Sequence, residues 1–534
     1  MIRIENLSVA FDGTEVVKNV NLEIADGEIL GVVGESGSGK SVTALTLMGL
    51  VSQEAVITSG RIFYDDAVLT EAGKPKDKAL YRAYQGSRMS MVFQEPMTSL
   101  NPTKRVGAQV EEMLRLHTGD MTAEQRKERV LETFLQVGLK DAQRVYDSYP
   151  HQLSGGMRQR AMIAMAVILK PGLVVADEPT TALDVSVQNQ IIALLRQINR
   201  QQKNAMLFIT HDLNLAKRLC HRVAVMKDGR VVESGTVAEI FESPKEAYTK
   251  RLIEAVPSKA KSDVRKAIRC QTLQNKALQG QARGFGEHIL EVKGLNVFYK
   301  EGSNSLFSGN KKKLVVSDAS FTIKAGETLG LVGESGCGKT SLSKAILGMN
   351  KNIEGSVVHY SNRPQMIFQD PYSSLNPSKT IGWLLQEPLR AQGILDKSKE
   401  LTAKDREAAA FDMLHRVGME DKYFYRKPSQ LSGGQRQRIS IGQALITRPG
   451  LVIADEPVSA LDVTIQAQIM ELMRSLQEEM RLSFLFISHD IHVVYQMSDC
   501  IMVMKEGRIV ELGDTKEVFE NPKEAYTKQL LQES

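Results

Sequence analysis

Long apolar runs are missing from this 534-residue sequence. The densest one, Ala161 to Leu169, is about half as long as a bilayer-spanning helix requires. The N-terminus carries an acidic residue early and lacks the apolar core of a secretory signal. We therefore expect a cytoplasmic chain, which would need separate membrane subunits to serve any membrane process.

Cysteine and excess charge are also scarce. None of the four cysteines has a CxxC neighbour, so neither a zinc site nor a disulfide framework is indicated; they are Cys220, Cys270, Cys337 and Cys500. The net charge of +5 is small for this length and argues against a dedicated nucleic-acid-binding protein. The length itself allows about three or four compact units.

The sequence repeats itself once. The segment GESGSGKS recurs as GESGCGKT, LSGGMRQR as LSGGQRQR, LVVADEP as LVIADEP, and the tail PKEAYTK occurs twice. Lys339 follows Lys40 by 299 residues, and Gln369 follows Gln94 by 275, so the second copy lacks 24 residues between these points. So long a period indicates a domain duplication. We predict a first domain over 1–257, a basic linker over 258–287 and a second domain over 288–534.

Each copy alternates short β-branched runs with longer amphipathic stretches. This alternation predicts an α/β layer in which helices flank the strands. The region from Met89 to Arg160 carries little strand signal, and we expect it to form a helical subdomain, with an equivalent in the second copy.

The glycine-rich segments follow the pattern GxxxxGK[ST], each between an apolar run and a helical one. Backbone amides of such a loop and of the following helix N-terminus bind phosphate. Lys40 and Lys339 are expected to reach the β- and γ-phosphates of ATP, and Ser41 and Thr340 to ligate Mg²⁺. The loops comprise Gly34, Glu35, Ser36, Gly37, Ser38, Gly39, Lys40 and Ser41, and Gly333, Glu334, Ser335, Gly336, Cys337, Gly338, Lys339 and Thr340.

An acidic pair ends an apolar strand in each copy. Asp177 and Asp455 are placed to hold Mg²⁺, and the adjacent Glu178 and Glu456 to orient or deprotonate the attacking water. Alone, such a pair would read as a surface feature, but beside a phosphate loop it indicates a catalytic site.

Two further positions recur in both copies. A lone histidine is more often structural, but His211 and His489 each stand 33 residues after the glutamate, which favours bonds to the γ-phosphate and to that glutamate. Gln94 and Gln369 lie between the glycine-rich loop and LSGG, where an amide could bind Mg²⁺ or water; alone they are weak evidence.

The LSGG segments open helices and so offer a second anion-binding N-terminus in each copy. Each copy already has one phosphate loop, so a second is useful if it caps ATP bound to the other copy. This predicts head-to-tail pairing of the two halves. The residues concerned are Ser154, Gly155, Gly156 and Met157 in the first copy and Ser432, Gly433, Gly434 and Gln435 in the second.

With these motifs, both halves resemble ABC transporter ATPases almost throughout. The resemblance implies two P-loop NTPase domains in tandem, each with a RecA-like core and a helical signature subdomain. It also implies that Phe11 and Tyr299 stack on adenine. The first signature has Met157 where the family usually has glutamine, which removes one polar contact but leaves Ser154 and both glycines.

The segments FQEPMTSLNP and FQDPYSSLNP and the tyrosine–threonine tails resemble oligopeptide and dipeptide importer ATPases, fused as in the microcin C and glutathione importers. That subfamily implies two permease subunits, an extracytoplasmic substrate-binding protein and a peripheral place on the cytoplasmic membrane face. Only Cys270 lies near a tail, so we expect no iron–sulfur cluster. A ribosome-associated tandem ABC translation factor and a peptide efflux motor remain as alternatives.

Overall fold

The computed structural model describes residues 1–73, 77–94, 99–181, 183–256, 288–300, 312–361, 363–459 and 461–533. They form two compact units, one built mainly from residues below 257 and the other mainly from residues 288–533. The linker predicted over 258–287, with Cys270, lies outside the described residues.

The first unit contains two sheets. An antiparallel sheet has the order β2-β1-β4-β5, and a six-stranded sheet has the order β10-β9-β3-β8-β7-β6. Only β10 runs antiparallel to its neighbour in the six-stranded sheet. The strands are β1 (Ile2–Phe11), β2 (Thr14–Ile24), β3 (Ile29–Val33), β4 (Ala55–Tyr64), β5 (Ala67–Glu71), β6 (Met89–Val92), β7 (Leu173–Asp177), β8 (Ala205–Thr210), β9 (Arg222–Lys227) and β10 (Arg230–Thr236).

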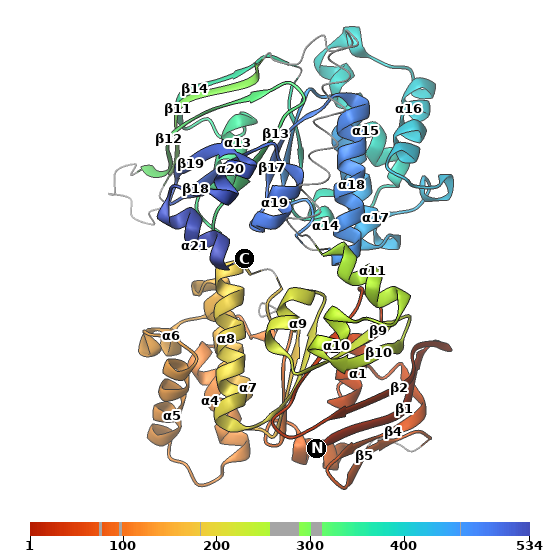
Figure 1. The fold of residues 1–534 in the computed structure, drawn as a ribbon, viewed down its shortest axis with the longest axis vertical. Coiled ribbons are helices and arrows are strands. Elements are labelled where there is room, and N and C mark those ends of the chain that lie inside the picture. Colours follow the sequence, from red (N-terminus) through yellow and green to blue (C-terminus); the bar gives the residue numbers. More distant parts are fainter. Residues whose placement is uncertain are drawn as a thin grey trace. The chain divides into compact units, whose positions relative to one another are not determined.

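Different elements cover the two faces of the six-stranded sheet. In Figure 1, α4 to α8 lie on one side of the six-stranded sheet and the antiparallel sheet lies on the other. The helices are α1 (Lys40–Leu47), α2 (Lys78–Tyr84), α4 (Val106–His117), α5 (Ala123–Gln136), α6 (Ala142–Asp147), α7 (Gly155–Val167), α8 (Val185–Gln202), α9 (Leu213–Leu219), α10 (Val237–Glu242) and α11 (Ala247–Ala255).

The second unit repeats this plan with one strand fewer in its antiparallel sheet. The sheets have the orders β12-β11-β14 and β15-β16-β17-β13-β18-β19. The strands are β11 (His288–Lys300), β12 (Lys312–Lys324), β13 (Thr328–Val332), β14 (Ile353–His359), β15 (Gln365–Ile367), β16 (Leu451–Asp455), β17 (Ser483–Ile487), β18 (Cys500–Lys505) and β19 (Arg508–Asp514). The helices are α13 (Lys339–Ile346), α14 (Pro371–Ser374), α15 (Ile381–Leu395), α16 (Ala403–Arg416), α17 (Gly433–Leu445), α18 (Val463–Met480), α19 (Ile491–Met497), α20 (Thr515–Glu520) and α21 (Ala525–Glu533).

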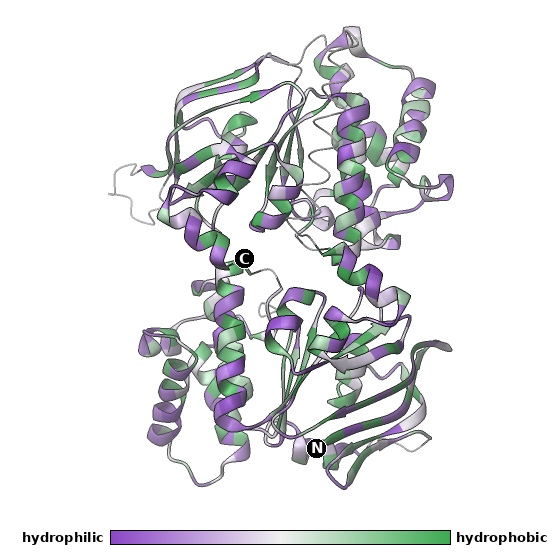
Figure 2. Ribbon diagram, in the orientation of Figure 1, coloured by the Kyte–Doolittle hydropathy of each residue, from purple (hydrophilic) through white to green (hydrophobic). Residues whose placement is uncertain are grey.

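Burial explains why the central strands are continuous apolar runs. Every residue of β3, β7 and β8 is buried, because both faces of the sheet are covered. By contrast, Figure 2 shows the outer helix α5 as mainly hydrophilic. None of the described helices is long and apolar enough to cross a membrane.

The predicted tandem α/β architecture is confirmed, with two differences of detail. The region from Met89 begins with a strand, β6, which pairs in parallel with β7. Its four residues are too few to show a period in the sequence. The 24 residues that the second copy lacks correspond, in the described part of the chain, to β5 and α2 of the first unit.

Candidate functional site

The glycine-rich loop of the first unit joins β3 to α1. Gly34 has φ 150°, and a Cβ there would lie 2.2 Å from the carbonyl oxygen of Met226. Gly39 has φ 96° and directly precedes α1. Both positions require glycine, and the turn that results leaves the N-terminus of α1 facing the loop, where its amides attract an anion.

The loop lysines are held close to their own loops. The Lys40 ammonium group donates to the carbonyl oxygens of Gly34 and Glu35 at 2.7 and 2.8 Å. The Lys339 ammonium group makes the equivalent bonds in the second unit, at 2.7 and 3.0 Å. Burial lowers the pKa of Lys40, because a buried ammonium group is less stable in its charged form unless a negative charge lies nearby. A polyphosphate would supply one.

A hydroxyl and a carboxylate meet at the end of each loop. The Ser41 hydroxyl donates to Asp177 at 3.0 Å, and the Thr340 hydroxyl donates to Asp455 at 3.1 Å. Burial raises the pKa of Asp177 to about 6, and it also raises the pKa of Asp455. A buried carboxylate beside a hydroxyl fits Mg²⁺, which prefers oxygen ligands and would favour the ionised form.

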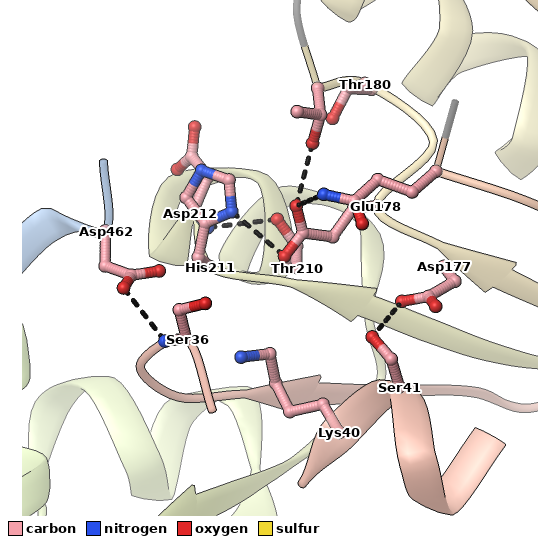
Figure 3. Close-up of polar contacts among 12 residues, drawn as sticks. Ser36, Lys40, Ser41, Asp177, Glu178, Thr180, Thr210, His211, Asp212 and Asp462 are labelled. Atoms are coloured by element: carbon pink, nitrogen blue, oxygen red, sulfur yellow. Dashed lines mark hydrogen bonds and ion pairs between the residues drawn. The ribbon is translucent and has the colours of Figure 1, made fainter. Parts of the chain in front are cut away.

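The glutamate after this aspartate contacts three side chains, and Figure 3 shows it beside one of them, His211. His211 Nδ1 lies 3.2 Å from one Glu178 carboxylate oxygen, while the Gln94 amide and the Thr181 hydroxyl donate to the other at 3.0 and 2.9 Å. Glu178 also has φ 45°, an uncommon conformation for a side chain of its kind. The surroundings therefore fix both its backbone and its carboxylate, as a site that orients water requires.

Burial and pairing shift the pKa of Glu178 in opposite directions, and the same is true of His211. Burial by itself would raise the pKa of Glu178, but the bond to His211, the positive charges of His211 and Lys40 and the bond from Thr181 together outweigh burial and lower the pKa. Burial would likewise lower the pKa of His211, but the bond to Glu178 and the negative charge of nearby carboxylates together raise it. Glu178 is therefore ionised at neutral pH, which suits an acceptor for a water proton.

The second unit builds the same cluster. His489 Nδ1 and the Gln369 amide each lie 3.0 Å from Glu456, whose φ is 48°. The pKa of Glu456 is lowered and that of His489 raised, with burial opposed by their mutual bond as before. In each unit the structure thus brings together the predicted lysine, hydroxyl residue, glutamine, aspartate, glutamate and histidine.

The signature segments open α7 and α17 as predicted helix N-termini. Ser154 accepts a bond from the Met157 amide, and Ser432 accepts one from the Gln435 amide, each at 3.3 Å. The Gln435 side chain also accepts from the Ser432 amide at 3.0 Å, which completes a reciprocal cap. Met157 has no polar side-chain group for the matching bond.

The second glycine of each signature permits a close approach of two helices. A Cβ on Gly156 would lie 2.8 Å from Val187 of α8, and one on Gly434 would lie 2.6 Å from Ile465 of α18. Gly155 and Gly433 have looser surroundings. Two glycines at the start of α7 and α17 also leave the helix amides uncovered by side chains.

The aromatic residues expected at adenine lie in equivalent strands. Phe11 ends β1 and is partly buried, whereas Tyr299, one residue before the end of β11, is 39% exposed. Their stacking on adenine stays a prediction. The sequence did not predict the bond from Thr181 to Glu178, nor that Tyr248 and Tyr526 of the repeated tails accept bonds from the loop amides of Glu35 and Glu334. The only signal for the tyrosines was the repetition of the tail itself.

Comparison with known proteins agrees with this arrangement. Residues 17–181 and 316–459 match the family described as ABC transporter, and residues 232–280 and 510–533 match the C-terminal region of oligopeptide/dipeptide transporters. The chain is 41% identical to an uncharacterized ABC transporter ATP-binding protein, YejF, of Escherichia coli K12, with 99% of each chain covered.

Two other relatives have more specific names. The chain is 41% identical to the glutathione import ATP-binding protein GsiA of Pectobacterium atrosepticum, covering 99% of this chain and 89% of that protein. It is 40% identical to the peptidoglycan transport ATP-binding protein YejF of Agrobacterium fabrum, covering 99% and 96%.

Among solved structures, RNase-L Inhibitor matches 96% of this chain and 91% of its own, with a TM-score of 0.62 and 20% identity, which is a likeness of fold alone. The glycine-rich loops, the acidic pairs and the LSGG segments lie within regions that the family match covers, and the similarity to relatives extends over the full length. This chain therefore belongs to the ABC transporter family, as a tandem ATP-binding protein whose ATPase activity is coupled to transport.

Proposed function

We propose that this chain is the ATP-hydrolysing subunit of a bacterial importer for dipeptides, oligopeptides or peptide-like compounds. The observation that carries the proposal is the tail of each unit, which matches the C-terminal region of oligopeptide/dipeptide transporters. The names of the full-length relatives, which refer to glutathione import and peptidoglycan transport, support the same substrate class.

In the proposed reaction, the loop amides and Lys40 hold the phosphates of ATP, and Glu178 orients or deprotonates the attacking water. His211 holds Glu178 in place through their 3.2 Å contact and donates toward the γ-phosphate. Lys339, Glu456 and His489 have the same roles in the second unit. Mg²⁺ would neutralise phosphate charge, held by Ser41, Gln94 and Asp177 in one site and by Thr340, Gln369 and Asp455 in the other.

We further propose that the units pair head to tail, so that each signature helix caps the ATP held by the other unit. The support is chemical, since each unit has a phosphate loop of its own and a second glycine-rich helix N-terminus at α7 or α17. One composite site would join Lys40, Asp177, Glu178 and His211 to Ser432–Gln435. The other would join Lys339, Asp455, Glu456 and His489 to Ser154–Met157.

The proposed partners are two transmembrane permease subunits and an extracytoplasmic substrate-binding protein, with no nucleic acid. The chain would then be peripheral, on the cytoplasmic face of the cell membrane. The absence of a membrane-spanning helix among the described residues is compatible with that place.

The test is reconstitution. The chain should co-purify with multispanning subunits, and in proteoliposomes their ATPase rate should rise when the substrate-binding protein and a mixture of dipeptides and oligopeptides are added on the extracytoplasmic side. Labelled peptide should accumulate on the side that holds the ATPase, and the double variant Glu178→Gln/Glu456→Gln should accumulate none. Peptide moving in the opposite direction would indicate efflux. Sedimentation with ribosomes and not with membranes would indicate a translation factor.

A further inference from the structure

The tail of each unit touches the glycine-rich loop of the same unit. The Glu35 amide donates to the Tyr248 hydroxyl at 3.4 Å, and the Glu334 amide donates to the Tyr526 hydroxyl at 3.2 Å. Tyr248 belongs to α11 and Tyr526 to α21, the last described helix of each unit. The contact occurs in both units, where the segments that form it, PKEAYTK and GESG, are repeated.

Both tyrosines are enclosed. Tyr248 is 8% exposed and Tyr526 is 7% exposed. The ammonium group of Lys227, at the end of β9, lies 5.1 Å from the ring centre of Tyr248, and that of Lys505, at the end of β18, lies 4.8 Å from the ring of Tyr526. Each ring therefore lies close to the lysine at the end of a core strand, while its hydroxyl binds the loop.

The start of each tail is fixed to the edge strand of the sheet. The Glu233 carboxylate, in β10, accepts bonds from the amides of Lys245 and Glu246 at 2.8 and 3.2 Å. In the second unit Glu511, in β19, accepts from Lys523 and Glu524 at 2.9 and 3.3 Å. Each carboxylate holds the chain immediately before the helix, and the tyrosine follows within the first helical turn. The segment that places each tyrosine hydroxyl at the loop is therefore itself held in position.

The loop also packs against a core strand. Gly34 packs so tightly on the Met226 carbonyl oxygen that no side chain fits there, and Gly333 does the same on Met504. The next residue along, Glu35 or Glu334, is the one whose amide the tail hydroxyl binds. The first two residues of the loop are therefore held by both a core strand and the tail, whereas the amides at the start of α1 and α13 are expected to bind the phosphates.

We propose that Tyr248 and Tyr526 are positioning residues for nucleotide binding, each holding the first amides of its own glycine-rich loop in the conformation that receives the phosphates. The tail of this subfamily would then be a functional part of the ATP site as well as a terminal extension. The proposal concerns ATP binding, which the family match supports, and it does not depend on which compound is transported.

The test uses the full chain and the non-hydrolysable analogue AMPPNP with Mg²⁺, titrated by calorimetry. Tyr248→Phe keeps the ring and removes only the acceptor. We expect the affinity of one site to fall about two- to tenfold, the range that one neutral hydrogen bond spans. Tyr248→Phe/Tyr526→Phe should weaken both sites. In steady-state assays KM for ATP should rise while kcat stays within twofold, because the tyrosine touches neither the water-orienting glutamate nor the histidine.

Two controls remove a tyrosine hydroxyl elsewhere. Tyr64 donates to the Arg88 carbonyl oxygen and Tyr360 donates to Glu291, both away from the loops. Tyr64→Phe and Tyr360→Phe should leave the affinity for AMPPNP unchanged. Hydrogen exchange of the peptide that contains Gly34–Ser41 should become faster in Tyr248→Phe and stay unchanged in Tyr64→Phe, which a general loss of stability would not produce.

The outcomes are decisive. Unchanged affinity and unchanged loop exchange in both Tyr248→Phe and Tyr526→Phe would overturn the proposal, as would equal weakening by the control variants. Should Tyr248→Phe fail to fold, Tyr526→Phe examines the same contact in the second unit. Glu233→Gln, which weakens the anchor of the tail and leaves the hydroxyl in place, should give the same direction of change with a smaller amplitude.

Discussion

Cys337 is the residue at which the two glycine-rich loops differ most in chemistry. It occupies the place of Ser38, and both side chains are buried, at 8% and 4% exposed. Burial raises the pKa of the Cys337 thiol, so the thiol is uncharged and unreactive at neutral pH. We expect Cys337→Ser to retain ATPase activity within twofold, measured by phosphate release, with Ser38→Cys as the reciprocal control. A loss of more than tenfold in Cys337→Ser alone would show that the thiol has a specific role.

Single residues also show where sequence reasoning stops. Lys40, Asp177 and His211 could be predicted because their types and spacing are tied to phosphate chemistry and occur twice. Thr181 and Tyr248 could not, because their contacts with Glu178 and Glu35 depend on how distant segments pack. A threonine hydroxyl or a tail tyrosine carries no spacing rule that marks it in advance.

At the scale of elements, Gly49 and Gly348 form a matched pair at the ends of α1 and α13. Both have positive φ, 65° and 71°, which costs a residue with a Cβ about 1–2 kcal/mol. A Cβ on Gly49 would also lie 2.5 Å from the buried ring of Tyr81, in α2, whereas one on Gly348 would have no atom within 4 Å. Gly49→Ala should therefore destabilise the first unit by about 2–5 kcal/mol, and Gly348→Ala should destabilise the second by about 1–2 kcal/mol.

The measurement is proteolysis of the full chain at increasing urea concentration, with fragments of each unit followed separately. This avoids the assumption that a chain of two units unfolds in one step. Equal losses of stability in the two variants would mean that α2 yields to the added methyl group, so the contact with Tyr81 would not be rigid.

The signature helices differ in their caps, and the difference predicts a small gain. Gln435 closes a reciprocal cap with Ser432, while Met157 leaves the Ser154 amide without that side-chain bond. Met157→Gln should stabilise the first unit by about 0.3–1.5 kcal/mol, with ATPase activity within twofold of the parent. Gln435→Met should lower the stability of the second unit by a similar amount. Proteolysis in urea, with fragments of each unit followed separately, checks the prediction, and destabilisation by Met157→Gln would contradict it.

Element by element, the central strands and their order in the sequence were predictable, since buried parallel strands are apolar runs. The antiparallel sheets were less so. In β2 the buried residues only partly alternate with exposed ones, and β1 has register shifts at Leu7 and Val9 that interrupt its period. The length difference between the two copies located the missing segment, but the sequence could not tell that this segment adds the strand β5.

At the scale of the whole molecule, the two units carry equivalent reaction centres. The glutamate–histidine distances are 3.2 and 3.0 Å, the glutamate φ angles are 45° and 48°, and both glutamates have a lowered pKa. Neither site has lost a predicted catalytic side chain. From this equivalence we predict that both sites hydrolyse ATP, unlike a tandem protein in which one site hydrolyses ATP and the other only binds it.

If both sites hydrolyse ATP, substitution of either glutamate should lower the ATPase rate by a similar amount. Glu178→Gln and Glu456→Gln keep the shape of the side chain and remove the proton acceptor, so each should leave no more than half of the parent ATPase rate, and the two losses should be similar. The double variant should lose about 100-fold or more, the lower range for a general base. Glu128→Gln and Glu407→Gln, exposed on α5 and α16, are the matched surface controls and should change nothing. If one single variant kept the full rate while the other lost nearly all of it, only one site would hydrolyse ATP, and the equivalence of the two centres would be one of structure without equal turnover.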